Sequence, residues 1–282
     1  MDLNRRVEAA LGQSFQTKNS VGGGCIATST LITAEDGSDY FLKSLAGKGA
    51  MFRLEANGLL ELSKANAIRV PEVIHADDDF IILEVIRTGH QDHRFMETFG
   101  RQFAEMHRLQ SDSFGFYEDN YIGATPQENS RRTEEWAEFY WESRLLYQFK
   151  RAERHGYSSS EMTDLASKLE HALPALLRGS EESPCILHGD LWSGNFMVGA
   201  DGEPVLIDPA VYYGHREADL GMTHLFGGFS HSFYRAYNEA YPLPAGHERR
   251  IGLYMLYHIL NHLNLFGMGY YSQAIRTMRQ YV

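Results

Sequence analysis

The chain has 282 residues, 43% of them apolar and 22% charged, which is ordinary for a folded protein with a sizeable core. Its net charge of −11 argues against a general affinity for nucleic acid or for an anionic membrane surface. No apolar run approaches the roughly 20 residues needed to cross a bilayer, and residues 1–6 lack the apolar stretch of a signal peptide. We therefore expect a cytoplasmic protein with no nucleic-acid partner and no membrane partner.

Three consecutive glycines, Gly22, Gly23 and Gly24, lie between strands expected at residues 15–21 and 28–33. Glycines let backbone N–H groups approach a ligand closely, as a loop that covers phosphates requires. A glycine-rich hairpin without a ligand is an open alternative, because the usual G-x-G-x-x-G pattern is absent. We predict that this loop contributes to ATP binding.

One lysine, Lys43, lies in an apolar strand expected at residues 40–45. Twelve residues later, Glu55 lies on the inner face of a helix expected at residues 50–65. A strand lysine paired with a helix glutamate positions the phosphates of ATP in kinase-like enzymes. We predict that Lys43 and Glu55 form this pair. The alternative is that Lys43 lies on the exposed face of its strand.

Two further strands are expected at residues 70–75 and 79–86, and the second is strongly apolar. In a kinase-like fold the chain leaves the small lobe at this point. The backbone groups of Glu84, Val85 and Ile86 would then meet the adenine edge of ATP.

From about residue 92 the apolar residues recur at helical spacing. We expect helices near residues 92–109, 133–155, 159–177, 246–267 and 270–281, with a long loop at 114–129. The predicted fold class is therefore α+β: a bilobal, protein-kinase-like fold with an N-terminal antiparallel sheet lobe that includes a helix and a larger, mainly helical C-terminal lobe. The predicted boundaries are 1–86 for the ATP-binding lobe and 87–282 for the catalytic and substrate-binding lobe.

The most specific signal is an H-x-D-x-x-x-x-N pattern that contains Asp190 and Asn195, followed thirteen residues later by Asp208. Apolar runs flank Asp201-Gly202, which is typical of a tight hairpin turn. Such a hairpin would bring Asn195 and Asp208 together, next to the loop that carries Asp190. We predict that Asp190 accepts a proton and that Asn195 and Asp208 bind Mg²⁺. Polar residues that only tighten loops are the alternative.

The segment after Asp208 is short, and a helix is expected soon after it, starting near Asp219. Protein kinases place a long activation segment here, so its absence favours a small substrate over an extended peptide. We expect Asp219 to cap this helix or to hold a loop. His107 is expected to be a hydrogen-bonded helix residue, and His258 and His262 to serve packing rather than metal binding.

Several motifs, taken in order along nearly the whole chain, resemble the fructosamine kinase (ketosamine-3-kinase) family. They are G-G-G-C-I (22–26), G-A-T-P-Q-E-N (123–129), E-W-A-E-F-Y (135–140), H-G-D-L-W-S-G-N (188–195), I-D-P-A (207–210), Y-G-H-R-E (213–217), F-G-G-F-S (226–230) and the C-terminal stretch 257–270. The resemblance implies an ATP- and Mg²⁺-dependent kinase that phosphorylates the 3-hydroxyl of ketosamines: ribulosamine, erythrulosamine or fructosamine, free or protein-bound. The phosphorylated adduct then decomposes and frees the amine, which is deglycation.

Trp192 lies two residues after Asp190, and Cys25 follows the three glycines. Trp192 is expected to pack on the sugar ring of the substrate, as aromatic faces can, and a core tryptophan is the alternative. Cys25 is either a small semi-buried residue or a redox-active thiol, and the resemblance adds a redox-linked homodimer as an alternative to a monomer. Cys185 is expected to be buried and inert.

Other functions remain open on the sequence. The nearest rival is a phosphotransferase for aminoglycosides, choline or another small hydroxylated compound. A non-catalytic nucleotide-binding module would be expected to have lost Lys43, Asp190, Asn195 or Asp208, and all four are present. Nothing specific favours a pure interaction protein.

Overall fold

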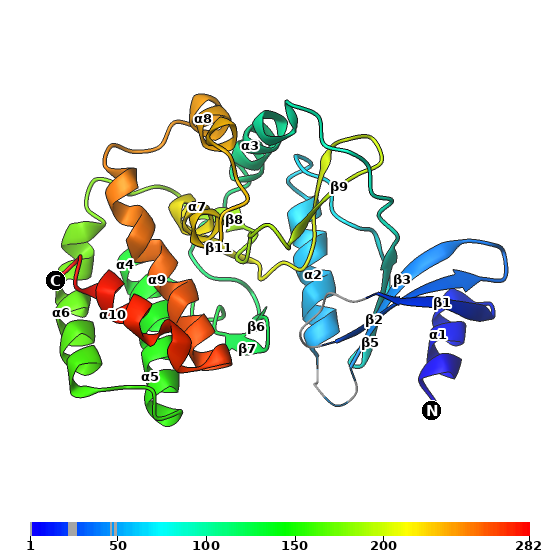
Figure 1. The fold of residues 1–282 in the computed structure, drawn as a ribbon, viewed down its shortest axis with the longest axis horizontal. Helices are drawn as coiled ribbons and strands as arrows, with labels where there is room; N and C mark the ends of the chain where they lie inside the picture. The colour runs from blue at the N-terminus through cyan, green and yellow to red at the C-terminus, as the bar shows by residue number, and fades with distance from the viewer. Residues whose placement is uncertain (1, 22–26, 46, 48–49) are drawn as a thin grey trace.

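The computed structural model describes residues 2–21, 27–45, 47 and 50–282. A β-sheet with two helices, formed by the first part of the chain, lies beside a larger and mainly helical region (Figure 1). The predicted α+β class is confirmed. Among the helices that the structure describes, none combines the length and the hydropathy of a membrane-spanning segment.

The N-terminal region is built on one five-stranded antiparallel sheet with the order β1-β2-β3-β5-β4. Its strands are β1 (Phe15–Val21), β2 (Thr28–Ala34), β3 (Asp39–Ser44), β4 (Val73–Ala76) and β5 (Phe80–Glu84). Strand β4 begins later than predicted, because Pro71 has no N–H group to donate to a ladder. Strand β5 also begins later than residue 79, since Asp77 Oδ1 accepts the N–H groups of Asp79 and Phe80 in a turn.

Two helices cover opposite faces of this sheet. Helix α1 (Leu3–Leu11) packs its buried Val7 with Phe80 and Ile82, whereas α2 (Met51–Ser63) packs with Ile81 and Leu83. Successive residues of β5 therefore point to different helices, as the period of a strand requires. This explains why β5 is a continuous apolar run rather than an alternating one.

The second region holds the remaining helices around one large apolar core. They are α3 (Phe95–Met106), α4 (Trp136–Phe139), the π-helix η1 (Tyr140–Leu146), α5 (Tyr147–Arg154), α6 (Ser160–Leu176), α7 (Arg216–Leu225), α8 (His231–Ala240), α9 (His247–Phe266), the short 3₁₀ helix η2 (Met268–Tyr270) and α10 (Tyr271–Met278). The helix predicted at 133–155 is thus three consecutive segments with a π turn in the middle.

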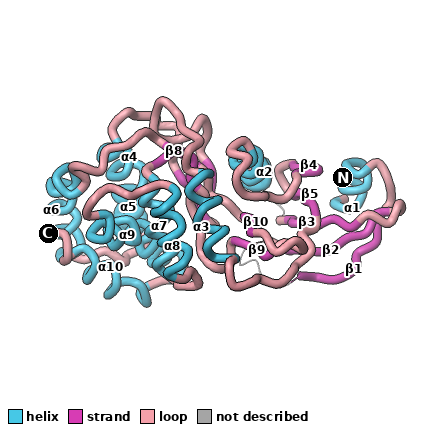
Figure 2. The backbone as a smooth tube through the Cα atoms, turned by 90° about the horizontal axis from the view of Figure 1, so that it is seen from above, coloured by secondary structure: helices cyan, strands magenta, loops and turns pink. Residues whose placement is uncertain are grey.

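Three pairs of very short strands complete the fold. They are β6 (Asn120–Ile122) with β7 (Thr125–Gln127), β8 (Cys185–Leu187) with β11 (Tyr212–Gly214), and β9 (Phe196–Val198) with β10 (Pro204–Leu206). The segment 114–129 was predicted to be a long loop, but it contains the β6–β7 hairpin. Three-residue strands are too short to show a period of two in the sequence. Figure 2 shows β9 and β10 between the sheet and the helical region.

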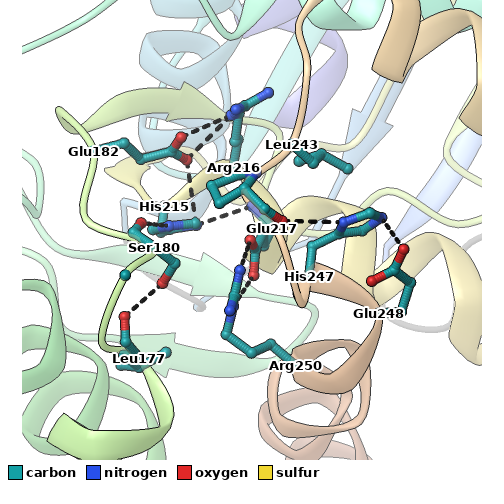
Figure 3. A network of polar contacts seen from close by, with 12 residues as sticks. Leu177, Ser180, Glu182, His215, Arg216, Glu217, Leu243, His247, Glu248 and Arg250 are labelled. Atoms are coloured by element: carbon teal, nitrogen blue, oxygen red, sulfur yellow. Dashed lines mark hydrogen bonds and ion pairs between the residues drawn. The ribbon is translucent and has the colours of Figure 1, made fainter.

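Buried charges anchor helix α7 at its first turn (Figure 3). Arg250 of α9 donates from Nε and Nη2 to the two carboxylate oxygens of Glu217, at 2.7 and 2.6 Å. Arg216 donates from Nε to Glu182, at 2.9 and 3.2 Å. These contacts fix the helix that also carries Asp219.

Candidate active site

The predicted hairpin is present and gathers the candidate metal ligands. Strands β9 and β10 pair through a turn in which the Gly202 amide donates to the Gly199 carbonyl at 2.9 Å. At the open end, the Ile207 amide donates to the Asn195 carbonyl at 3.0 Å. Asp208, the next residue, is therefore held beside Asn195.

Asp190 and Asn195 are in direct contact. Asn195 Nδ2 donates to the Asp190 carbonyl oxygen at 2.8 Å and to Asp190 Oδ2 at 3.1 Å. Asp190 keeps some solvent exposure, but burial raises the pKa of its carboxyl well above the ordinary value, and the bond from Asn195 opposes this only in part. A carboxylate of raised basicity that keeps some solvent exposure is suited to accepting a proton.

The loop that carries Asp190 is pinned by Asp219 from α7. Its two carboxylate oxygens accept the amides of His188 at 2.7 Å and of Gly189 at 2.8 Å. Gly189 has φ 82°, and a Cβ there would overlap the Ala210 carbonyl oxygen, so only glycine fits the position. The loop-holding role expected of Asp219 is confirmed.

Lys43 joins the two regions at the site. Its Nζ donates to Glu55 Oε1 at 2.7 Å and also contacts Asp208 Oδ1. Burial opposes the charged form of Lys43, but the two carboxylates outweigh it and hold its pKa above the ordinary value. Burial raises the pKa of Glu55, and Lys43 counters part of that shift. The sequence pattern did not indicate the contact with Asp208.

Polar residues of the β6–β7 hairpin hold the backbone just after Asp208. Gln127 Nε2 donates to the Ala210 carbonyl at 3.0 Å, and Asn120 Nδ2 donates to the Val211 carbonyl at 2.7 Å. Asp208 itself has φ 53°, a conformation that few residues other than glycine adopt. The segment 120–127 therefore supports the site, although its sequence was read as a loop.

The candidate adenine side lies at the end of strand β5, which is Glu84. The Glu84 amide donates to the Glu72 carbonyl at 2.9 Å, so this N–H group is already in use. Val85 and Ile86 directly follow the last residue of β5. The predicted phosphate loop, Gly22, Gly23 and Gly24 with Cys25, lies outside the described residues.

His107, His258 and Cys185 are all buried. His107 is buried and lies 2.7 Å from the Tyr237 hydroxyl, as expected of a hydrogen-bonded helix residue. His258 is buried, which lowers its pKa to about 3, and its carbonyl accepts from His262 Nδ1 at 2.7 Å. Cys185 is buried, and burial raises the pKa of its thiol.

Trp192 is an exposed residue, so the alternative of a core tryptophan was wrong. Its side chain is 38% exposed and lies two residues after Asp190 on the same loop. One face of the indole lies against Gly194, where a Cβ would overlap the ring. A large apolar ring is thus kept at the surface beside the candidate catalytic carboxylate.

The donor set at the open end of the hairpin fits a hard divalent cation. Asn195 uses its Nδ2 group toward Asp190, which leaves the amide oxygen as an acceptor, and the Asp208 carboxylate is 46% exposed. An amide oxygen, a carboxylate and phosphate oxygens are the kind of ligands that Mg²⁺ takes in phosphotransferases.

Comparison with known proteins assigns the family. Residues 1–282 match the fructosamine kinase family. The chain belongs to the fructosamine kinase family. It is 44% identical over 271 residues to an Arabidopsis thaliana protein named protein-ribulosamine 3-kinase, chloroplastic, a match that covers 93% of this chain and 82% of that protein. The chain is therefore a phosphotransferase.

Solved structures agree with this family. A crystal structure from Thermobifida fusca, of a protein assigned as a fructosamine-3-kinase, is 35% identical and matches with a TM-score of 0.91 over 99% of this chain and 98% of that one. An ADP-bound aminoglycoside phosphotransferase matches with a TM-score of 0.63 at 14% identity, over all of both chains. The second likeness shows the kinase-like fold alone.

In this fructosamine kinase family member, two hydrogen bonds between side chains link helix α2 to the helical region. The Tyr213 hydroxyl donates to Glu61 Oε1 at 2.9 Å, and Asn57 Nδ2 donates to Glu118 Oε1 at 2.8 Å. Glu61 is buried and lies on the same helix as Glu55. Because β11, which carries Tyr213, pairs with β8 at the entry to the Asp190 loop, this bond connects α2 to that loop.

We expect Tyr213→Phe to lower kcat/KM for ATP by about tenfold, because a hydrogen bond to a buried carboxylate is lost and α2 can shift. Steady-state kinetics would measure this, with Tyr234→Phe on α8 as the matched control. If the loss of kcat/KM acts through Glu55, then adding Tyr213→Phe to a Glu55→Gln variant should lower kcat/KM for ATP little further. Additive effects of the two substitutions would contradict this explanation.

Proposed function

We propose that this protein transfers the γ-phosphoryl group of ATP to the 3-hydroxyl of a ketosamine. The contact between Asp190 and Asn195, with Asp208 held beside Asn195 by the hairpin, carries the proposal. The name of the Arabidopsis relative supports a ribulosamine as substrate. The resulting 3-phosphate would decompose, losing inorganic phosphate and freeing the amine, with ribulosamines, erythrulosamines and fructosamines, free or protein-bound, as candidate substrates.

In the proposed reaction Asp190 takes the proton of the sugar hydroxyl while the hydroxyl oxygen attacks the γ-phosphorus. A new oxygen–phosphorus bond forms, and the bond from the γ-phosphorus to the β,γ-bridging oxygen breaks, which releases ADP. Asn195, through its bonds to Asp190, holds the carboxylate in place. Most of the rate enhancement would come from positioning and electrostatic stabilisation, as in other phosphoryl transfers.

Lys43, with Glu55, would contact the α- and β-phosphates of ATP, and Gly22, Gly23 and Gly24 would cover them. Asn195 and Asp208 would hold Mg²⁺, which neutralises phosphate charge when bound. In the present structure Lys43 already contacts the Asp208 carboxylate.

Other proposals follow the sequence predictions. Residues 1–86 would form the ATP-binding lobe and residues 87–282 the catalytic lobe, and the backbone of Val85 and Ile86 would meet the adenine. Trp192 would pack on the sugar ring.

A cytoplasmic location and a redox-linked dimer through Cys25 stay predictions. Non-reducing gels of the wild type and of Cys25→Ser would test the dimer.

The deciding experiment is an ATP-consumption screen across ribulosamine, erythrulosamine, fructosamine, an aminoglycoside and choline. We expect consumption with ketosamines, accompanied by release of one free amine for each ATP used. Turnover of only the aminoglycoside or choline would overturn the substrate assignment. No turnover of any compound would overturn the proposed function.

Lys43→Met is expected to lower kcat/KM for ATP by about 10²-fold, the size of effect seen when one preorganised charge-stabilising group is removed. The substitution also leaves the carboxylates of Glu55 and Asp208 without their shared cation. Kinetics with varied ATP would measure the loss. Lys168→Met, on the exposed face of α6, is the control, and equal activity of the two variants would contradict the role of Lys43.

A further inference from the structure

Five aromatic side chains form a continuous surface that starts at the Asp190 loop. We call it the aromatic wall; it consists of Trp192, Phe226, His262, Phe266 and Tyr270. The ring centroids are 6.0 Å apart between Trp192 and Phe226, 4.9 Å between Phe226 and His262, and 5.4 Å between His262 and Phe266. Tyr270 lies 5.2 Å from His262. Phe226 is 42% exposed and Phe266 59% exposed, so the wall faces solvent.

Apart from Trp192, the residues of this wall come from two sequence motifs that the phosphoryl transfer described above does not use. They are F-G-G-F-S (226–230) and the C-terminal stretch 257–270. The first forms the loop after α7 and the second forms the end of α9 with η2. Residues far apart in the sequence thus converge beside Trp192.

The loop at 226–230 is seated directly on the catalytic loop. Gly228 has φ 94°, and a Cβ there would lie 2.6 Å from Ser193 Cβ, so glycine is needed for the close approach. Phe229 packs toward the core, with its ring centroid 4.9 Å from that of Phe233 and 5.6 Å from that of Phe196. The loop therefore anchors itself through Phe229 while it leaves Phe226 exposed beside Trp192.

His262 is the one acidic or basic side chain among the five residues of the wall. Burial lowers the pKa of His262, and the hydrogen bond from its Nδ1 to the His258 carbonyl opposes that shift. Exposed apolar patches of this kind usually serve binding, and aromatic faces attract both apolar groups and cations.

The chemistry of the substrate indicates what reaches this wall. In a ketosamine the reacting hydroxyl is on C3 and the amine nitrogen is on C1, so the carrier of the amine leaves the site from the sugar's C1 end. That nitrogen is a secondary amine and is protonated at neutral pH. Beyond it, a protein-attached adduct continues as a lysine side chain with neighbouring residues.

We propose that the aromatic wall binds the amine-bearing carrier of the substrate, and that this carrier is a polypeptide with apolar side chains next to the modified lysine. This inference rests on the proposed function and names the substrate class within it. Trp192 would meet the sugar end, and Phe226, Phe266 and Tyr270 would meet the carrier.

The test compares two ribulose adducts with each variant: one on methylamine and one on the lysine of a short peptide in which leucines flank that lysine. Phe226→Ala and Phe266→Ala should each raise KM for the peptide adduct about fivefold or more, as truncation of an interface aromatic does. The kcat values and the KM for the methylamine adduct should stay within about twofold of wild type, since neither ring contacts the reacting atoms.

Leu60→Ala is the control and should affect neither adduct, because Leu60 is an apolar side chain on α2 whose 53% exposure lies between those of Phe226 and Phe266. Phe226→Tyr should restore the wild-type KM, and Phe226→Leu replaces Phe226→Ala if the alanine variant does not fold. Equal effects on the two adducts, or no effect on the peptide adduct, would overturn the inference. A wild-type protein that turns over neither adduct would overturn the proposed function itself.

Discussion

Replacing Asp190 with asparagine is expected to lower kcat by about 10²- to 10⁴-fold, the contribution of a general base. Asparagine has nearly the same shape, so ATP binding should be retained, but its amide cannot take the proton of the sugar hydroxyl. The burial that raises the pKa of Asp190 makes the carboxylate a stronger base and adds to the loss when it is removed. Single-turnover kinetics together with ATP titration would separate chemistry from binding.

Asp201→Asn provides the matched control, because it makes the same chemical change in the exposed turn of the β9–β10 hairpin. It should leave kcat within about twofold of the wild-type value. An Asp190→Asn protein that keeps more than about a tenth of wild-type turnover would show that another group accepts the proton.

Arg250→Met is expected to reduce the free energy of unfolding by about 3–5 kcal/mol, because it leaves the buried carboxylate of Glu217 without its partner. Both oxygens of that carboxylate accept from Arg250, and both residues are buried. Urea unfolding of the two proteins would measure the change. The activity should fall as well, since the helix that begins at Arg216 also carries Asp219, which holds the Asp190 loop.

The neighbouring residue supplies the control for this prediction. Arg249 is exposed, so Arg249→Met should change the unfolding free energy by no more than about 0.5 kcal/mol. Adding Glu217→Gln to Arg250→Met should recover part of the loss, because the unpaired buried charge is removed. A loss below about 1 kcal/mol for Arg250→Met alone would mean that water or another group compensates Glu217.

Local patterns predicted the features whose signal lies within a few residues. The Asp-Gly turn specified the β9–β10 hairpin, and with it the approach of Asn195 to Asp208. Helical spacing located most of the helices of the second region, because an amphipathic helix repeats its apolar residues over many turns. Helix α3 nevertheless ends at Met106 rather than at Leu109.

Contacts between distant segments could not be predicted in this way. The support of the backbone after Asp208 by Asn120 and Gln127 joins residues more than 80 positions apart. The bond between Tyr213 and Glu61 spans 152 positions, and no periodicity connects the two. The strands β6 and β7 were missed for another reason, namely that three residues are too few to show alternation.

The sequence by itself determined the reaction class, because the spacing of Asp190, Asn195 and Asp208, together with the family motifs, is local along the chain. Only the tertiary structure decided how those groups are held and what surrounds them. Helix α7 holds the Asp190 loop through Asp219, and the packing of the α7–α8 loop and α9 leaves a row of aromatic rings exposed next to Trp192. The physical reason is that the burial or exposure of a side chain depends on which segments pack against it. Local sequence patterns do not specify which distant segments pack together.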